Sequence, residues 1–147
     1  MNDTSNTTNA ASQSDIPQSV SDFMQHITDL CGGEHARWAE NFNAGFANTL
    51  TTTVRRHDDG TTFLLTGDIP AMWLRDSSAQ FRPYLAVAVD DPELTALITG
   101  LVRQQFRFIN IDPYANAFNE TPSGATWDRT IRPIRSDHGC GNANTRW

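Results

Sequence analysis

Lysine is absent from this 147-residue chain, so all eleven of its basic residues are arginines. Seventeen acidic residues leave a formal net charge of −6. An acidic chain without a basic cluster argues against nucleic acid and against anionic membrane surfaces as partners. The chain also lacks a signal-peptide core at its start and any apolar run near the ~20 residues of a membrane span. These absences predict a cytoplasmic protein with no nucleic-acid or membrane partner.

Cysteine and histidine are scarce as well. The two cysteines, Cys31 and Cys140, lie far apart in no ligand-like spacing, which fits a reducing compartment better than a disulfide scaffold. The histidines do not cluster, and none forms a His-x-x-x-His pair; they are His26, His35, His57 and His138. The sequence therefore predicts no metal site and no cofactor.

Residues 1–19 are mostly Asn, Thr, Ser, Ala and Gln, with almost no apolar side chains to bury. Such a segment does not offset the entropy cost of ordering, so we expect a disordered tail. From Val20 the apolar residues recur every three or four positions until Gly32-Gly33, which predicts a helix that ends there. A second stripe predicts an amphipathic helix from about Glu34 to Thr51, and its members are Trp38, Phe42, Phe46 and Leu50.

Thr52–Leu65 changes to β-prone residues, with Asp58-Asp59-Gly60 between two short runs, a pattern that predicts a β-hairpin. Further on, Asp90-Asp91-Pro92 predicts the capped start of a long helix. The apolar stripe of this helix runs through Leu94, Leu97, Ile98, Leu101, Val102, Phe106 and Ile109. Short loops between amphipathic helices favour antiparallel neighbours. The predicted fold class is therefore mainly α, with a short β-hairpin.

The segment from Thr66 to Gln80 reads TGDIPAMWLRDSSAQ and contains two carboxylates, a guanidinium and an indole. Its glycine and proline deny it a continuous helix, so we expect it to begin as a loop. Asp76-Ser77-Ser78 then predicts the cap of a helix that continues through Phe81, Leu85 and Val89. Beside that cap, Arg75 offers paired donors and Asp76 offers acceptors to a polyhydroxyl ligand. A helix cap next to a structural ion pair is the alternative interpretation.

The segment from Asn110 to Asp128 is too polar for a core helix and too aromatic for a disordered linker. The rings of Tyr114, Phe118 and Trp127 are of the kind that stacks on sugar faces. The amides of Asn116 and Asn119 offer a donor and an acceptor together, which suits sugar hydroxyls. An ordered surface loop that is pinned by its aromatic side chains is the alternative.

These two segments resemble glycoside hydrolase family 125, the metal-independent exo-α-1,6-mannosidases. The resemblance is carried by TGDIPAMWLRDSSAQ and FINIDPYANAFNETPSG, and it covers residues from about Phe23 to Asp128. It implies that residues 20–128 are the N-terminal portion of an (α/α)6 barrel. It further implies an inverting mechanism and, as partner, a glycan or oligosaccharide that loses its non-reducing terminal mannose. The general acid and base are implied to lie beyond the matched segment, so no catalytic residue is assigned.

The resemblance also implies substrate-binding residues. In several (α/α)6 glycosidases an Arg-Asp pair after a tryptophan holds the terminal sugar, and Arg75-Asp76 after Trp73 is similar to that pair. Asn116 and Asn119 resemble another wall of the same pocket, and Asp68 is a further candidate. The alternative function is that of a small helical module that binds a glycan or a partner protein without catalysis.

A ring of helix pairs needs a longer chain, so the resemblance implies a fragment. Residues 129–147 have no helical period and depart from the family. Read in the neighbouring frame with permitted third bases, Gly139 to Trp147 becomes VWERKYEV, which is similar to a run shortly after a Trp-Asp dipeptide in family members. We therefore expect a frameshift near Arg129 and an out-of-frame tail. A partial ring is expected to expose Trp38, Phe42, Phe46 and Leu101, leaving the fragment molten and inactive.

Overall fold

The computed structural model describes residues 16–67, 69–115 and 117–122 of the chain. These residues form four α-helices and two antiparallel sheets of two strands each, which confirms the predicted mainly α class with a β-hairpin. The described elements do not form a closed ring of helix pairs, and the (α/α)6 barrel stays a prediction. Most of the predicted tail and all of residues 129–147 lie outside the described residues.

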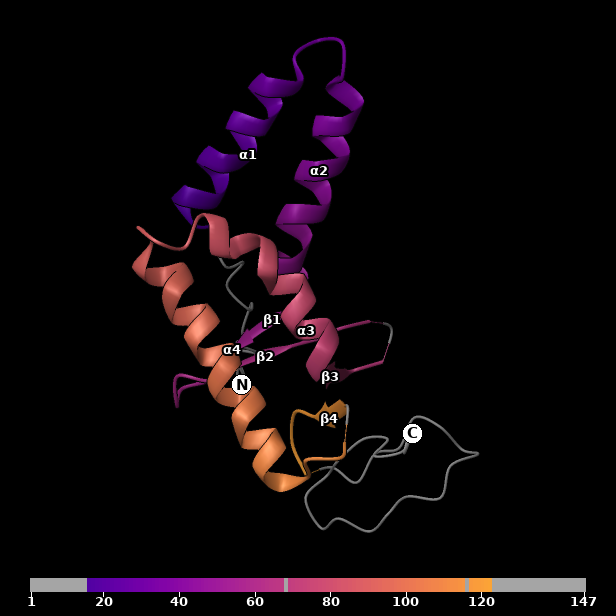
Figure 1. Cartoon of the computed structure of the whole chain (residues 1–147), viewed down its shortest axis with the longest axis vertical. Coiled ribbons are helices and arrows are strands. Elements are labelled where there is room, and N and C mark those ends of the chain that lie inside the picture. Colours follow the sequence, from indigo (N-terminus) through magenta and orange to yellow (C-terminus); the bar gives the residue numbers. More distant parts are fainter. Residues whose placement is uncertain (1–15, 68, 116, 123–147) are drawn as a thin grey trace, which may run out of the picture.

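Helices α1 (Gln18–Cys31) and α2 (Ala36–Asn48) form a helical hairpin at one end of the molecule (Figure 1). α1 ends before Gly32, whose positive φ of 55° suits glycine. The Phe23 ring of α1 lies against Phe42 and Phe46 of α2, with centroid distances of 6.1 and 5.6 Å. Both predicted helices, and the glycine stop between them, are therefore confirmed.

The predicted β-hairpin is confirmed too. After one π-helical turn (Thr49–Thr53), β1 (Val54–Arg56) pairs with β2 (Thr62–Leu64) in an antiparallel ladder. In the turn between them, Asp59 accepts the Thr61 amide proton at 3.0 Å. Gly60 has a positive φ of 76°. The turn residues thus stabilise the connection locally, for the reasons that made them a turn signal.

The hairpin packs on α4 (Pro92–Ile111). The two approach closely at Gly100, where an added Cβ would lie 2.5 Å from Thr62 Oγ1. Asp91 caps α4 as predicted, because its carboxylate accepts the Leu94 amide proton at 2.9 Å. Ser19 donates to the same carboxylate at 2.6 Å, and these two hydrogen bonds, the one from Ser19 first, lower the pKa of Asp91. The contact also explains why α1 begins at Gln18, inside the segment predicted to be tail.

β3 (Ala71–Trp73) leads directly into α3 (Leu74–Phe81), and a 3-10 turn (Arg82–Ala86) follows. The predicted cap at Asp76-Ser77-Ser78 is wrong, since Asp76 lies within the first turn of the helix. Both serine hydroxyls instead donate to the Leu74 carbonyl oxygen, at 3.0 and 2.9 Å. The continuation through Leu85 and Val89 is wrong as well, because Pro83 lacks the N–H that would extend the α-helix.

An apolar core joins the helical hairpin, α4 and both sheets. Phe46 and Leu101 are buried in it, so the prediction that they are exposed is wrong. α1 covers Phe46, which also stacks on Tyr84 with ring centroids 4.5 Å apart. Trp38 is 67% exposed, as predicted, and Phe42 is partly buried. Other apolar residues of the α4 stripe are exposed, among them Val102, Phe106 and Ile109, and the molten, inactive fragment stays a prediction.

Candidate functional site

The second sheet brings the two sequence motifs together. β3, from the first motif, pairs with β4 (Ala117–Asn119), from the second, and the opposite residues are Ala71 and Asn119, Met72 and Phe118, and Trp73 and Ala117. Opposite residues of an antiparallel pair share a face, and successive residues alternate between the faces. Asn119 therefore lies on the same face as Trp73, and Phe118 lies on the same face as Met72.

The face of Met72 and Phe118 packs into the core. Both side chains are buried, and the Phe118 ring stacks on Phe108 of α4, with centroids 4.4 Å apart and planes inclined by 2°. The prediction that Phe118 stacks on a sugar is therefore wrong, because the helix covers its ring. Tyr114 is 84% exposed, and Trp127 lies outside the described residues.

A pocket of about 260 Å³ lies where β3 meets α3, and it opens to solvent. Three of the lining residues, Trp73, Arg75 and Asp76, are predicted site residues. The other three, Thr66, Gly67 and Ile69, belong to the loop before β3.

Hydrogen bonds hold both walls of this pocket in place. The Thr66 hydroxyl accepts the Trp73 amide proton at 2.9 Å and donates to the Ala71 carbonyl oxygen at 3.1 Å. The loop before β3 is thereby fixed to the strand. Gln105 of α4 donates to the hydroxyls of Ser77 and Ser78, each at 2.8 Å, and so fixes the start of α3.

Arg75 and Asp76 form an ion pair at the mouth of the pocket. Arg75 Nη2 lies 3.3 Å from Asp76 Oδ2, and the two side chains are 86% and 38% exposed. An exposed pair of this kind contributes about 0–1 kcal/mol to stability. Of the structural alternative for these residues, the helix cap is wrong, because Asp76 lies within the first turn of α3, whereas the ion pair is present. Both charged groups face solvent, where a ligand can reach them.

The structure thus places Trp73, Arg75 and Asp76 on one pocket. Asn119 lies in the neighbouring strand, where it is buried, and it is not one of the residues that line the pocket. Asp68 and Asn116 lie outside the described residues. Four of the six predicted site residues are therefore placed, three of them together.

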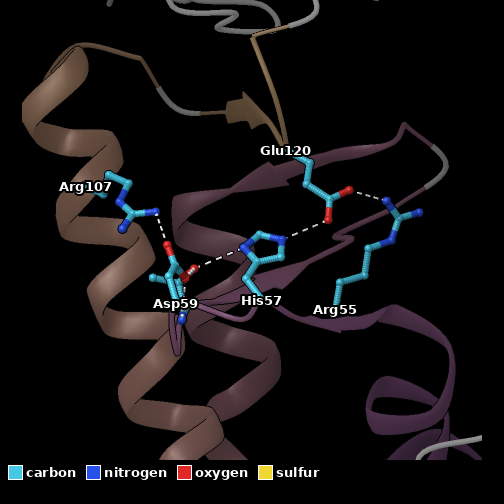
Figure 2. A network of polar contacts seen from close by, with 6 residues as sticks. Arg55, His57, Asp59, Arg107 and Glu120 are labelled. Carbon is cyan, nitrogen blue, oxygen red and sulfur yellow. Dashed lines mark hydrogen bonds and ion pairs between the residues drawn. The ribbon is translucent and has the colours of Figure 1, made fainter. Parts of the chain in front are cut away.

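Sequence reasoning missed a network of polar contacts between the first hairpin and the end of β4 (Figure 2). Glu120, the residue after β4, lies 3.0 Å from His57 Nε2 and also accepts a hydrogen bond from Arg55 of β1. The sequence signal for this contact was weak, because His57 and Glu120 are 63 positions apart. Only the place of Glu120 beside Asn119 in the second motif pointed to it.

The other half of the network fixes the hairpin turn to α4. Thr61 Oγ1 lies 3.0 Å from His57 Nδ1 and donates to Asp59 at 2.6 Å. Arg107 of α4 donates to the other oxygen of Asp59 at 2.9 Å. A continuous series of contacts therefore runs from α4 through the hairpin turn to the end of β4 (Figure 2).

Both carboxyl groups of this network ionise more readily than usual. Hydrogen bonds from the Thr61 hydroxyl and amide, and then from Arg107, hold the pKa of Asp59 far below its usual range. Burial opposes the ionisation of Glu120, but hydrogen bonds from His57 and Arg55 outweigh it and lower the pKa of that carboxyl. Both groups are therefore charged acceptors near neutral pH.

Among the described residues, no group of three or more His, Cys, Asp or Glu side chains is placed to hold a metal ion. None of the helices in those same ranges combines the length and the apolar character needed to cross a bilayer.

Comparison with known proteins gives consistent matches. The model of a family described as metal-independent alpha-mannosidase (GH125) matches residues 35–139. The meiotically up-regulated gene 157 protein of Schizosaccharomyces pombe is 38% identical over 107 residues, which cover 70% of this chain and 20% of the yeast protein.

A solved structure is similar as well. It is that of a metal-independent α-mannosidase of Streptococcus pneumoniae in a non-productive complex with α-1,6-mannobiose. The two chains are 42% identical and superimpose with a TM-score of 0.70, over 74% of this chain and 25% of that chain. This chain therefore spans only a fifth to a quarter of the length of the relatives it matches.

Proposed function

This chain belongs to the metal-independent α-mannosidase family GH125, and we propose that it carries the mannose-binding part of an inverting exo-α-1,6-mannosidase. In this proposal, the non-reducing terminal mannose of a glycan or oligosaccharide occupies the pocket between β3 and α3. As the sequence predicted, we further propose a cytoplasmic location with no nucleic-acid or membrane partner.

One observation carries the proposal: the two motifs meet in the β3–β4 sheet, and the first motif lines an open pocket beside that sheet. This pairing explains how residues so far apart in the chain come to lie beside one pocket. The α-1,6-mannobiose in the complex of the S. pneumoniae mannosidase supports the choice of sugar.

The lining side chains provide what a sugar ring needs. The apolar face of a pyranose packs well on an aromatic ring, and Trp73 offers one at the pocket wall. Arg75 presents a fork of donors, and the Asp76 carboxylate presents acceptors, so that the pair can bind neighbouring hydroxyls. Asn119 on the adjacent strand, with Asp68 and Asn116, completes the proposed set of binding residues.

Hydrolysis with inversion requires two carboxyl groups, ~6.5–9.5 Å apart, one acting as general acid and one activating water. Among the described residues, Asp76 is the one carboxylate that lines the pocket. A single carboxylate cannot fill both roles. We therefore propose that the chain binds mannose without hydrolysing the glycosidic bond, and that the acid and base belong to the part of such enzymes that lies beyond the matched segment.

The test is an NMR titration of the 147-residue chain with α-1,6-mannobiose, which yields a dissociation constant. Arg75→Ala removes the fork of donors, and we expect the dissociation constant to rise by about tenfold or more. Arg82→Ala is the matched control, because Arg82 is an exposed arginine that directly follows the same helix and lies outside the pocket. Its affinity should equal that of the unsubstituted chain.

Equal affinities for the unsubstituted chain and Arg75→Ala would contradict the proposed site, and so would the absence of any binding. Hydrolysis is tested separately, by incubating the chain with α-1,6-mannobiose and measuring free mannose. We expect none to be released. Release of mannose would show that the acid and base lie within this chain.

A further inference from the structure

We propose that Glu120 and His57 are positioning residues of the mannose pocket, which they influence through strand β4. This inference rests on the proposed function, because the pocket concerned is the one to which that function assigns mannose. Neither side chain lines the pocket. Their effect on it passes through the sheet that carries Trp73 on one strand and Asn119 on the other.

The link to the pocket is short. Glu120 directly follows Asn119, the last residue of β4, and Asn119 pairs with Ala71 of β3. The Glu120 side chain is 25% exposed. It accepts hydrogen bonds from Arg55 of β1 and from His57, the residue that follows β1. Since β3 and β4 share no connecting turn, contacts outside the sheet decide how firmly β4 lies along β3. Glu120 provides such a contact at the end of the strand.

At its other end, the network is bound to helix α4. Asp59 in the hairpin turn is bound to Arg107 of α4, and the same hairpin approaches α4 closely at Gly100. Glu120 is therefore connected, through His57 and the turn, to a 20-residue helix of the core (Figure 2). A binding site keeps its geometry when supporting residues of this kind fix its walls.

The hydrogen bonds of the network define the protonation of His57. Thr61 has one hydroxyl proton, which points to Asp59 because an ionised carboxylate only accepts. Thr61 Oγ1 then accepts from His57 Nδ1, which requires a proton on that nitrogen. Glu120 accepts from Nε2, which requires a second proton. The network is therefore complete only when the imidazole ring carries both protons.

The His57 ring is held from several elements. Its Nε2 lies 3.0 Å from Glu120 after β4, and its Nδ1 lies 3.0 Å from the Thr61 hydroxyl of the turn. From β2, the apolar ring of Phe63 lies alongside at a centroid distance of 6.4 Å. Removal of either polar contact interrupts the network, so that β4 is held less firmly and the affinity for mannose falls.

The test compares the dissociation constant of α-1,6-mannobiose between variants of the whole chain at one fixed pH. Glu120→Gln retains the shape of the side chain but not its charge, and we expect it to bind about three- to tenfold more weakly, as for the loss of one hydrogen bond. His57→Gln is a second variant that should show a similar loss of affinity.

Arg56→Gln is the matched control. It breaks an exposed ion pair between β1 and Glu93, on the same strand as Arg55 but outside the network. Its affinity should equal that of the unsubstituted chain. Equal affinities for the unsubstituted chain, Glu120→Gln and His57→Gln would overturn the proposal.

A readout without sugar separates this proposal from the proposed function. The amide NMR signal of Trp73 should move in Glu120→Gln relative to the unsubstituted chain, and should stay in place in Arg56→Gln. If the Trp73 signal is unchanged in Glu120→Gln, the positioning role is overturned whether or not the sugar binds. If it moves as expected but no mannobiose binds, the network does hold β4 and the proposed function fails.

Discussion

Each of the two sheets has a pair of antiparallel strands of three residues, but the strands of the two pairs are joined differently. β1 and β2 are connected by a turn whose own residues supply the hydrogen bonds. β3 and β4 come from distant segments, with α3 and α4 between them. Closing a long loop costs more entropy than closing a short one, and two isolated strands are marginally stable at best.

The pocket lies on the sheet that lacks its own turn. That sheet depends on the core for support, through Phe118 against Phe108 and through Glu120 bound to the first hairpin. The β1–β2 sheet has local stability and in addition packs on α4. The position of the pocket strands therefore depends on the surrounding core and on the first hairpin. The first hairpin, in contrast, is held together by its own turn and helps to hold the pocket strands in place.

Removal of the core support of β4 should have the largest effect. Phe118→Ala deletes a buried ring that stacks on Phe108, and the free energy of unfolding should fall by about 3–5 kcal/mol. Urea denaturation measures the change, and binding of mannobiose should be lost with it. Tyr114→Ala is the control, because that ring is 84% exposed and its removal should change stability by at most about 0.5 kcal/mol. Equal losses in the two variants would show that β4 is not held by the core.

Disturbing the contact between the hairpin and α4 should have a smaller effect. In Gly100→Ala the new methyl group would lie 2.5 Å from Thr62 Oγ1 and 2.7 Å from the Gly60 carbonyl oxygen, and such overpacking costs about 1–3 kcal/mol. Thermal unfolding monitored by circular dichroism measures it. In Gly45→Ala on α2 the methyl group meets nothing within 4 Å, so this variant should be as stable as the parent chain or slightly more stable. A Gly100→Ala variant as stable as the parent chain would mean that the first hairpin and α4 move apart without cost.

Acid should weaken the molecule at the contacts that carboxylates make. The pKa values of Asp59, Asp91 and Glu120 are lowered in the folded chain from ordinary values of 3.8 for Asp and 4.5 for Glu, so the folded state binds fewer protons than the unfolded state. Their contribution is complete above the ordinary values and is lost as the pH falls through the lowered ones. Urea denaturation midpoints should therefore decline below about pH 4.5. Glu120→Gln should show a shallower decline, and an unchanged slope would contradict its role.

The smallest effect on stability is expected at the mouth of the pocket. Arg75→Ala should change the free energy of unfolding by less than about 0.5 kcal/mol, because its ion pair with Asp76 is exposed. The same urea measurement checks this. A loss of more than about 1 kcal/mol would place Arg75 among the structural residues instead of the binding residues.

Features that depend on neighbouring residues were predictable from the sequence. Gly32 ends a helix, Asp91 caps one, and the Asp-Asp-Gly turn closes a hairpin, each through contacts within a few positions. The grouping of Trp73, Arg75 and Asp76 also followed, because they are adjacent in one motif.

Features that depend on distant residues were not predictable. Asp76 failed as a cap because pairing of β3 with β4 keeps the chain extended up to Trp73, so the helix begins at Leu74. Phe118 resembled a surface aromatic only because Phe108, which covers it, lies on another element. The contact of His57 with Glu120 joins two segments whose spacing carries no pattern.

The central claim is that a terminal mannose lies in the pocket between β3 and α3. The most direct measurement is a set of nuclear Overhauser effects between α-1,6-mannobiose and the isotope-labelled chain. The account predicts contacts from the ring protons of the non-reducing mannose to the Trp73 indole, together with saturable shifts of the Arg75 and Asp76 amides. Contacts confined to other surfaces, with those three residues unaffected, would contradict it.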